Sequence, residues 1–237
     1  MVIDVFIWSY EREAVEIRLA NLMGIVDCHV AVQATNTFRG EPRTVDLMRT
    51  FGVVDVVVTI PAGLDAWQSE KWLRDQALIE ARLLYGEDDI YMVSDGDEIP
   101  HPDAIVNAVL SQTPMRLLTD YRNFYADWRA LDHVLDAQPT IGTIGDYNAA
   151  GGACLARWEG KWAFSDIRGW HLSSLGSNDQ IKQKLATFAH TEYDKAEYSE
   201  NIENARSEMR DFLNRFDLEY TDDIPKGVPA HLLGGRR

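Results

Sequence analysis

Residues 88–100, DDIYMVSDGDEIP, join a mostly apolar stretch directly to a turn that is rich in carboxylates. The run 89–93 contains the β-branched and aromatic side chains that are typical of a buried strand. Gly96 lets the backbone of the turn bend closely around a ligand. The flanking Asp95 and Asp97 offer hard oxygen ligands of the kind that Mg²⁺ and Mn²⁺ prefer. The stretch therefore predicts a divalent metal site at the end of a buried strand.

Ahead of this stretch, short β-branched runs alternate with segments that have helical periodicity. Several of the runs are apolar on both faces, as in strands that helices cover on both sides. This alternation indicates a mostly parallel sheet, so we expect an α/β fold with helices on both faces. The expected strands are residues 2–7, 29–32, 53–60 and 89–93, and the expected helices are 11–22, 42–51 and 68–85.

Three loops follow expected strands, at residues 8–10, 33–40 and 95–98. In open parallel sheets, ligands bind in the crevice beyond the carboxyl ends of the strands. We therefore expect the three loops to converge on one crevice, with residues 1–100 forming the ligand-binding half of the molecule.

The second half of the chain, residues 101–237, has a less regular pattern. Neither a repeat nor a low-complexity tract nor a clear linker interrupts the sequence, so we expect a single domain over residues 1–237. The expected elements of the second half are helices at 102–111, 178–189 and 200–216, a strand at 116–121, and loops or antiparallel strands at 121–128 and 141–152.

The chain is strongly acidic. It has 38 Asp and Glu residues against 23 Lys and Arg residues, a formal charge of -15. Such a surface repels phosphate backbones, so nucleic-acid binding is not expected. A substrate that carries phosphate would need a bridging cation, which agrees with a metal at the acidic turn.

Two cysteines, Cys28 and Cys154, are present, and neither has the paired spacing of a zinc site or a disulfide framework. The N-terminus enters directly into an expected strand, so no signal peptide is expected. The sequence contains no apolar run of about 18 residues, the length that a membrane span requires. We therefore expect a soluble, cytoplasmic protein without a membrane span.

A second group of conspicuous residues is GWHLSSLG at 169–176. A neutral imidazole at His171 is a suitable further metal ligand, although without further context a core histidine with satisfied hydrogen bonds is the better explanation. Lys182 and Lys184 lie on the helix that follows. Cations near the start of a helix suit a diphosphate, but a solvated helix face is the alternative, and it is the better interpretation of Lys182.

Four segments together resemble glycosyltransferase family 17, which includes β-1,4-mannosyl-glycoprotein β-1,4-N-acetylglucosaminyltransferases. The order and spacing of the segments agree with the family from about residue 4 to 193. One departure is Gln33, which stands where the family has a glutamate. The segments are DVFI with EAVEIRL (4–19), VQATNTFRG (32–40), DDIYMVSDGDEIP (88–100), and GWHLSSLG with the later lysine and FAH (169–190).

The resemblance implies a GT-A type, Rossmann-like fold and a metal-dependent glycosyl transfer. It implies a nucleotide-sugar donor, UDP-linked and with an N-acetylglucosamine-like sugar, and inversion at the anomeric carbon. The acceptor would be a carbohydrate or a glycosylated molecule. The divalent metal would be Mn²⁺ or Mg²⁺.

The resemblance and the spacing together suggest roles for individual residues near the donor. Asp97 is expected to hold the metal, with Asp95 on the ribose or on the metal and His171 completing the coordination. The other expected donor-binding residues lie beyond the first two strands, on the helix before the acidic strand, and on the helix after the histidine. They are Trp8, Ser9 and Tyr10 at the nucleobase, together with Asn36, Arg74, Gln76 and Lys184.

The base and the acceptor site are also expected from the sequence. Inversion requires a carboxylate or histidine within hydrogen-bond reach of the acceptor hydroxyl, and the candidates are Asp166 and Glu98. The second half is rich in aromatic side chains, whose faces pack against the C–H faces of sugar rings. We expect Tyr125 or Trp128 to wall an acceptor groove beside the metal, whereas other aromatics belong to the core.

Two other functions fit the same pattern. A sugar-nucleotide nucleotidyltransferase shares the α/β fold and the metal-binding carboxylates, but it usually has a glycine-rich basic loop after the first strand, which residues 8–12 are not. A non-catalytic sugar-binding protein that kept the fold is the second. Asp95, Asp97 and His171 together argue against it, whereas Gln33 keeps it open.

Overall fold

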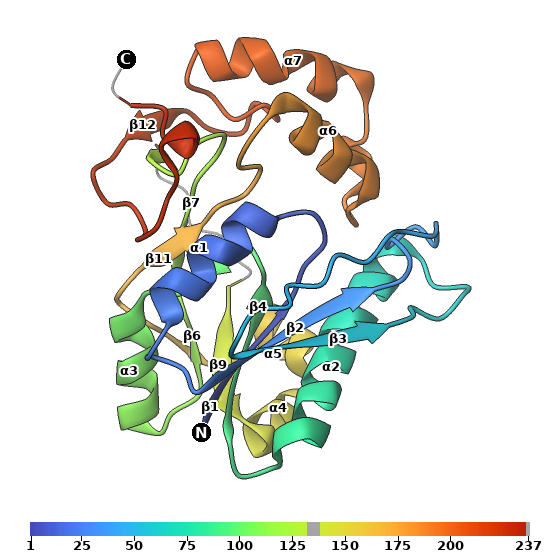
Figure 1. Ribbon diagram of the computed structural model, residues 1–237, viewed down its shortest axis with the longest axis vertical. Coiled ribbons are helices and arrows are strands. Elements are labelled where there is room, and N and C mark those ends of the chain that lie inside the picture. Colours follow the sequence, from blue (N-terminus) through green and yellow to red (C-terminus); the bar gives the residue numbers. More distant parts are fainter. Residues whose placement is uncertain (132–137, 236–237) are drawn as a thin grey trace.

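A seven-stranded, mostly parallel sheet forms the centre of the molecule (Figure 1). The fold is seen in a computed structural model that describes residues 1–131 and 138–235. The strands, in order across the sheet, are β10 (Ala163–Phe164), β6 (Met115–Arg116), β9 (Thr140–Thr143), β4 (Ile90–Asp95), β1 (Val2–Ile7), β2 (Cys28–Ala34) and β3 (Val53–Val58).

The strand directions explain why one edge of the sheet collects the functional loops. β1 pairs in parallel with β2 and β4, and β2 pairs in parallel with β3. Only β9, among the strands of this sheet in the described ranges, is antiparallel to its neighbours. The carboxyl ends of β1, β2 and β4 therefore lie at one edge, as expected for an α/β fold.

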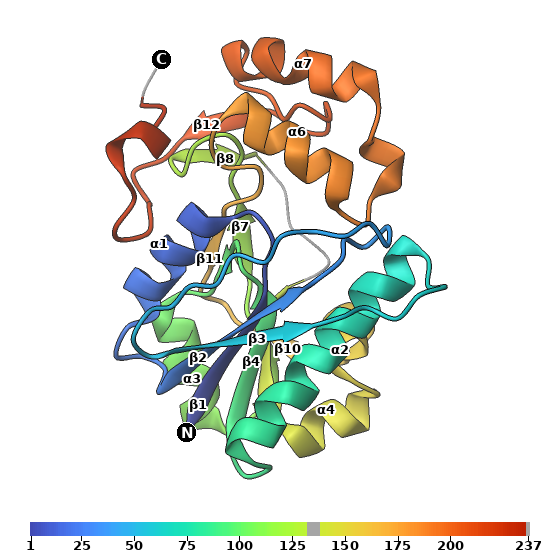
Figure 2. The same cartoon turned by 45° about the vertical axis from the view of Figure 1, so that its right-hand side comes forward.

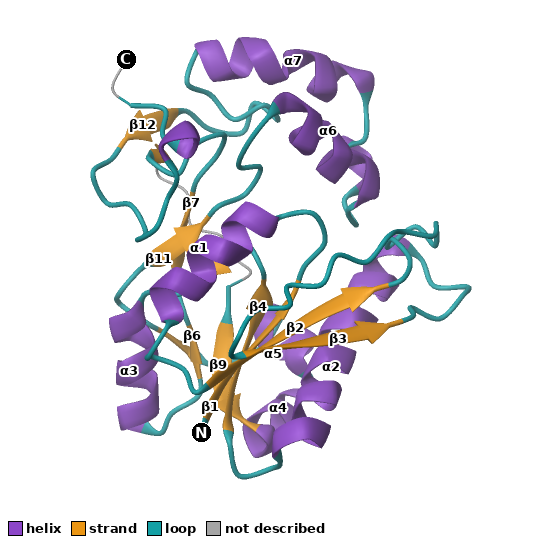
Figure 3. Cartoon of the chain, viewed as in Figure 1, coloured by secondary structure: helices purple, strands orange, loops and turns teal. Residues whose placement is uncertain are grey.

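Helices cover both faces of the sheet (Figure 3). Alternate residues of β1 point to opposite sides: Val5 packs with Ala77 in one core cluster, whereas Phe6 packs with Val15 in another. This arrangement confirms the predicted architecture of a mostly parallel sheet between helices. The helices on the Val5 side are α2 (Ala66–Tyr85), α4 (Ile144–Ala150) and α5 (Ala153–Trp158), and those on the other side are α1 (Arg12–Leu22) and α3 (Pro102–Ser111).

A second, smaller layer, called the upper layer below, lies over the carboxyl ends of the strands (Figures 1 and 2). It has its own apolar core, in which the indole of Trp128 packs with Leu185 and Phe212. Its helices are α6 (Asn178–Thr187), η1 (Thr191–Tyr193), α7 (Ala196–Ser207) and η2 (Ala230–Leu232). Its strands form two small sheets, β5 (Glu98–Ile99), β11 (Gly169–His171) and β7 (Thr119–Tyr121) in one, and β12 (Leu218–Tyr220) and β8 (Trp128–Ala130) in the other.

Several predicted elements differ from the observed ones. The helix expected at 42–51 does not form, because side chains bind the backbone amides of this segment: Asp55 accepts from Met48 and Arg49, and Gln33 accepts from Asp46. The strand expected at 116–121 is divided, because β6 joins the main sheet while β7 pairs with β11.

Two further boundaries differ in the second half. The predicted helix at 200–216 corresponds to α7, which ends at Ser207, and Met209 then takes a positive φ of 52°. The glycine-rich 141–152 contains both the strand β9 and the helix α4, which begins at the capping box of Thr143 and Asp146. Within the described parts of the chain, no helix combines the length and the apolar character needed to cross a membrane.

Candidate active site

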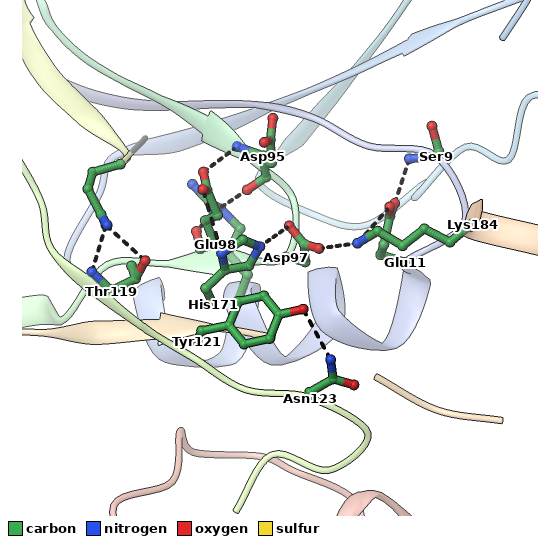
Figure 4. Close-up of polar contacts among 12 residues, drawn as sticks. Ser9, Glu11, Asp95, Asp97, Glu98, Thr119, Tyr121, Asn123, His171 and Lys184 are labelled. Atoms are coloured by element: carbon green, nitrogen blue, oxygen red, sulfur yellow. Dashed lines mark hydrogen bonds and ion pairs between the residues drawn. The ribbon is translucent and has the colours of Figure 1, made fainter. Parts of the chain in front are cut away.

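The acidic turn connects the main sheet to the small sheet of the upper layer. Asp95 ends β4, and Glu98 begins β5, which pairs antiparallel with β11. In this register His171 lies directly opposite Glu98. Two sequence segments that are more than 70 residues apart are thus fixed at one point by backbone pairing (Figure 4).

Gly96 is required by close packing rather than by an unusual φ. A Cβ at this position would lie 2.9 Å from Cβ of Trp8 and 3.0 Å from Cγ2 of Val15. Its backbone N–H also donates to the carbonyl oxygen of Ile7 at 2.8 Å. The turn is therefore held against the carboxyl end of β1 and against α1.

Arg18 of α1 holds the backbone of the acidic turn through hydrogen bonds, a role that was not predicted from the sequence. Its side chain is fully buried and pairs with the carboxylate of Asp4. It donates to Oγ of Ser94 at 2.7 Å and to the carbonyl oxygen of Asp95 at 3.2 Å, and it also contacts the carbonyl oxygen of Glu98. One guanidinium thus fixes both ends of the turn.

Asp95 and Glu98 are neutralised by two arginines. Arg74 of α2 donates to Oδ1 of Asp95 at 2.7 Å, and Arg157 of α5 donates to Oδ2 at 3.3 Å. Arg157 also makes two hydrogen bonds to the buried carboxylate of Glu98, at 2.6 and 2.7 Å. Burial alone would raise the pKa of Asp95, but the charges of Arg74 and Arg157 outweigh it and hold that pKa far below its usual range.

Asp97 lies between Lys184 and His171, as Figure 4 shows. Nζ of Lys184 is 2.6 Å from Oδ2 of Asp97, and Nε2 of His171 is 3.6 Å from Oδ1. Burial would raise the pKa of Asp97, but the charges of Lys184 and His171 lower it below its ordinary value. Asp97 is therefore a carboxylate at neutral pH.

The pair of Asp97 and His171 fits a divalent cation. Two atoms that bind one ion at roughly 2.1 Å each lie about 3–4 Å apart, and Oδ1 of Asp97 and Nε2 of His171 are 3.6 Å apart. The other ring nitrogen, Nδ1, is buried without a hydrogen-bond partner among the described residues and lies 4.0 Å from Oε1 of Glu98, too far for the hydrogen bond that a ligating histidine usually makes to an outer carboxylate. Asp95 is turned toward its arginines instead.

The protein ligands alone do not form a closed metal site. Over residues 1–131 and 138–235, no three His, Cys, Asp or Glu side chains converge as a metal-binding group. Mg²⁺ is commonly held by one or two carboxylates together with substrate phosphates and water. Asp97 and His171 therefore suit an ion whose remaining ligands come from a bound substrate.

A cavity of about 230 Å³ opens in front of the turn, lined by residues at the ends of β1 and β4 and by residues of α6 in the upper layer. Its walls combine carboxylates, three cations and aromatic side chains. Of the residues predicted for the site, those that line this cavity are Trp8, Ser9, Asp95, Asp97, Glu98, His171 and Lys184.

The remaining predicted residues lie elsewhere. Arg74 is buried directly behind Asp95, and Gln76 is bonded to Glu80 on α2. Tyr10 stacks under Arg43, outside the cavity lining. Asn36 is bonded to the backbone of Ile60 through both its donor and its acceptor.

Of the predicted base and acceptor residues, only Glu98 lines the cavity. Asp166 is exposed before β11 and does not line the cavity, whereas Glu98 lines it but is fully buried under Arg157. Trp128 is fully buried in the core of the upper layer, and Tyr125 packs against its ring. Neither of these two aromatics walls the cavity, because the upper layer uses them to hold itself together.

Several residues at the cavity were not predicted as site residues. Glu70, Arg157 and Trp158 lie on α2 and α5 and look like ordinary helix-face residues in the sequence, and Glu11 directly precedes α1. Phe38, Phe188 and His190 lie in the segments that carry the family resemblance, and Tyr193 lies in η1.

Comparison with known proteins identifies the family to which the chain belongs. The family model of glycosyltransferase family 17 matches residues 1–221 of the 237. Searches of curated proteins and of solved structures gave no significant match. Since the matched range includes the acidic turn, His171 and Lys184 and covers most of the chain, this protein belongs to glycosyltransferase family 17.

Proposed function

We propose that this protein is a metal-dependent, inverting glycosyltransferase. It would move an N-acetylglucosamine-like sugar from a UDP-linked donor to a carbohydrate or glycosylated acceptor. Membership of the family implies glycosyl transfer. The observation that supports the finer proposal is the group of Asp97, His171 and Lys184, which meets in the cavity at the carboxyl ends of the parallel strands.

Asp97 and His171 would hold the divalent ion, Mn²⁺ or Mg²⁺, on the diphosphate side of the cavity. When bound, such an ion neutralises charge on a departing diphosphate as a Lewis acid. Lys184 lies against Asp97 and is fixed on α6 at a point where its ammonium group can also contact a phosphate oxygen. In a chain with a net charge of -15, the bound ion and Lys184 would together make this part of the cavity suitable for an anion.

The nucleoside would lie beyond β1 and β2. Trp8 and Ser9 line the cavity at the end of β1, and Phe38 lines it in the loop after β2. Phe38 is partly exposed beside this polar loop and is suited to a nucleobase and its ribose, whereas Trp8 is almost completely buried. Asp95 pairs with Ile7 at the end of β1 and is bound by Arg74 of α2, so it lies between the nucleoside region and the α2 side of the cavity. It is partly accessible there and is available to a hydroxyl of the donor.

The test is a panel of nucleotide sugars incubated with the protein and Mn²⁺ or Mg²⁺, with a chelator as the control. We expect release of the nucleoside diphosphate from the correct donor, slowly to water and faster when an acceptor is present. Release of inorganic diphosphate would instead identify a nucleotidyltransferase. Metal-dependent binding without turnover of any donor would identify a sugar-binding protein.

A further inference from the structure

The acidic turn has two sides in the cavity. On one side Asp97 faces Lys184 and His171, and on the other Asp95 is bound by an arginine from each of two helices, Arg74 and Arg157. We propose that the second side is the acceptor subsite, in which Trp158 stacks on an acceptor sugar and Glu70 takes the proton from its hydroxyl. This inference rests on the proposed glycosyl transfer.

The two residues are placed by the arginines next to them. Glu70 lies one helical turn before Arg74 on α2 and accepts from it at 2.9 Å, while Trp158 follows Arg157 at the end of α5. The helices are joined where the backbone N–H of Cys154 donates to Oδ1 of Asp75 at 2.9 Å. Glu70 and Trp158 therefore both reach the cavity from the α2 and α5 side, close to Asp95.

Trp158 is an exposed aromatic at a cavity wall. It is 43% exposed, unlike Trp8, which is almost completely buried. An indole that is left accessible in a cavity is suited to cover the apolar C–H face of a sugar ring. Trp158 thus has the accessibility that Tyr125 and Trp128, which pack in the upper core, lack.

Glu70 differs from the other carboxylates of the cavity. Asp95 and Glu98 have both oxygens bound by arginine, and Asp97 is shared between Lys184 and His171. Glu11 accepts two backbone N–H groups of its own loop through Oε2, and its Oε1, which makes no hydrogen bond among the described residues, lies 3.9 Å from Nζ of Lys184 on the Asp97 side of the turn. Among the described residues, Oε1 of Glu70 is bound by Arg74, and Oε2 makes no hydrogen bond.

The placement also suits inversion. The acceptor oxygen attacks the anomeric carbon from the side opposite the departing diphosphate, and the new C–O bond forms as the bond from that carbon to the diphosphate oxygen breaks. The nucleoside diphosphate leaves with the electron pair, and the hydroxyl proton passes to Oε2 of Glu70. With the diphosphate held at Asp97 and Lys184, Glu70 lies across the turn, where the attacking hydroxyl must enter.

The experiment uses methyl glycosides of common hexoses and N-acetylhexosamines as acceptors, with donor hydrolysis measured separately. Trp158→Ala should raise the KM for the acceptor by roughly tenfold while leaving the donor Kd and hydrolysis unchanged. Glu70→Gln should lower kcat for transfer by about a hundredfold or more, with the donor Kd unchanged. The matched controls are Phe164→Ala, a side chain that is 46% exposed outside the cavity lining, and Glu80→Gln on the same helix as Glu70.

The outcomes separate this inference from the proposed function. If the wild-type protein hydrolyses a donor but transfers to none of the glycosides, the carbohydrate subsite is wrong while the transferase remains. If Trp158→Ala changes the donor Kd, or Glu70→Gln keeps normal turnover, the assigned roles are wrong. If no donor is bound or turned over by the wild-type protein, the proposed function itself fails.

Discussion

Asp97 of the acidic turn has separate roles for its side chain and its backbone. Its partners come from β11 and α6, and its own backbone oxygen accepts from the N–H of Leu172 at 2.8 Å. The side chain therefore serves the cavity, while the backbone holds the small sheet. Because of this division, we expect a change of the side chain to leave the backbone pairing of the small sheet in place.

Replacing Asp97 by asparagine should remove the metal-dependent part of donor affinity. An amide oxygen is a much weaker ligand than a carboxylate, whereas the backbone bond to Leu172 is preserved. The measurement is calorimetric titration with the nucleotide sugar, with and without Mn²⁺, together with thermal unfolding. Equal Mn²⁺-dependent affinity in Asp97→Asn and in the wild-type protein would refute the metal assignment.

Lys184 and Lys182 form a matched pair on α6. Nζ of Lys184 lies at the cavity beside Asp97, whereas Lys182 is exposed on the outer face of the same helix. We expect Lys184→Gln to weaken donor binding by about tenfold or more, because a charge-assisted phosphate contact is lost. Lys182→Gln should leave the donor Kd unchanged, and a loss of similar size in both variants would point to general electrostatics instead.

At the residue scale, the sequence reveals motif positions better than it reveals supporting residues. Asp97 and His171 were predicted because they lie in unusual segments, and the structure brings them together. Arg157 and Glu70 have no such signal, because an arginine and a glutamate on helices are usually solvated. The tryptophans show the same limit, since only packing distinguishes the buried Trp128 from the accessible Trp158.

At the scale of elements, β1 and α1 are joined by a buried ion pair. Burial alone would raise the pKa of Asp4, but the charge of Arg18 and hydrogen bonds from Arg18 and His29 lower it to about 2. Because the folded-state pKa is lower than the unfolded value, the ionised pair stabilises the fold above about pH 4. This contribution is lost as the pH falls from about 4 to about 2.

Asp4→Asn should therefore destabilise the protein by about 3–5 kcal/mol at neutral pH, because Arg18 would remain buried without its counter-charge. The free energy of unfolding, measured in urea at pH 7, 4 and 2.5, should differ most between the two proteins at pH 7. The difference should shrink toward pH 2.5. A constant difference at all three pH values would contradict the assigned role of the ion pair.

The turn and β1 also depend on one glycine. Gly96→Ala would place a Cβ within 3.0 Å of Trp8 and Val15, so we expect a loss of about 1–3 kcal/mol in stability. Gly145→Ala in α4 is the matched control, because its Cβ would meet nothing closer than 3.6 Å and alanine favours a helix. The measurement is the urea unfolding of both variants, and equal stabilities would show that the close packing at Gly96 is not needed.

The sequence predicted the regular helices and strands more reliably than segments whose backbone amides are bound by side chains from elsewhere in the chain. β1 is a nearly continuous apolar run, α2 follows helical periodicity, and α3 was predicted with its observed ends, Pro102–Ser111. The segment 42–51 has similar composition but forms no helix, because Asp55 and Gln33 bind its amides from neighbouring strands. Such contacts depend on how strands are placed in the sheet, which local periodicity does not contain.

For the whole molecule, the order of strands explains where the cavity forms. The carboxyl ends of β1, β2 and β4 lie together, and the upper layer covers them. The alternating pattern was sufficient to predict the sheet and the convergence of its loops. The upper layer was not predictable in the same way, because its core joins residues as distant as Trp128 and Phe212.

The most direct test of the metal and donor site is a crystal of the protein grown with Mn²⁺ and a nucleoside diphosphate. Anomalous scattering locates the manganese without reference to activity. We predict a peak at roughly 2.1–2.2 Å from both Oδ1 of Asp97 and Nε2 of His171, with the diphosphate between the ion and Lys184. A peak at another site, or a bound diphosphate with no ion near Asp97, would contradict the account.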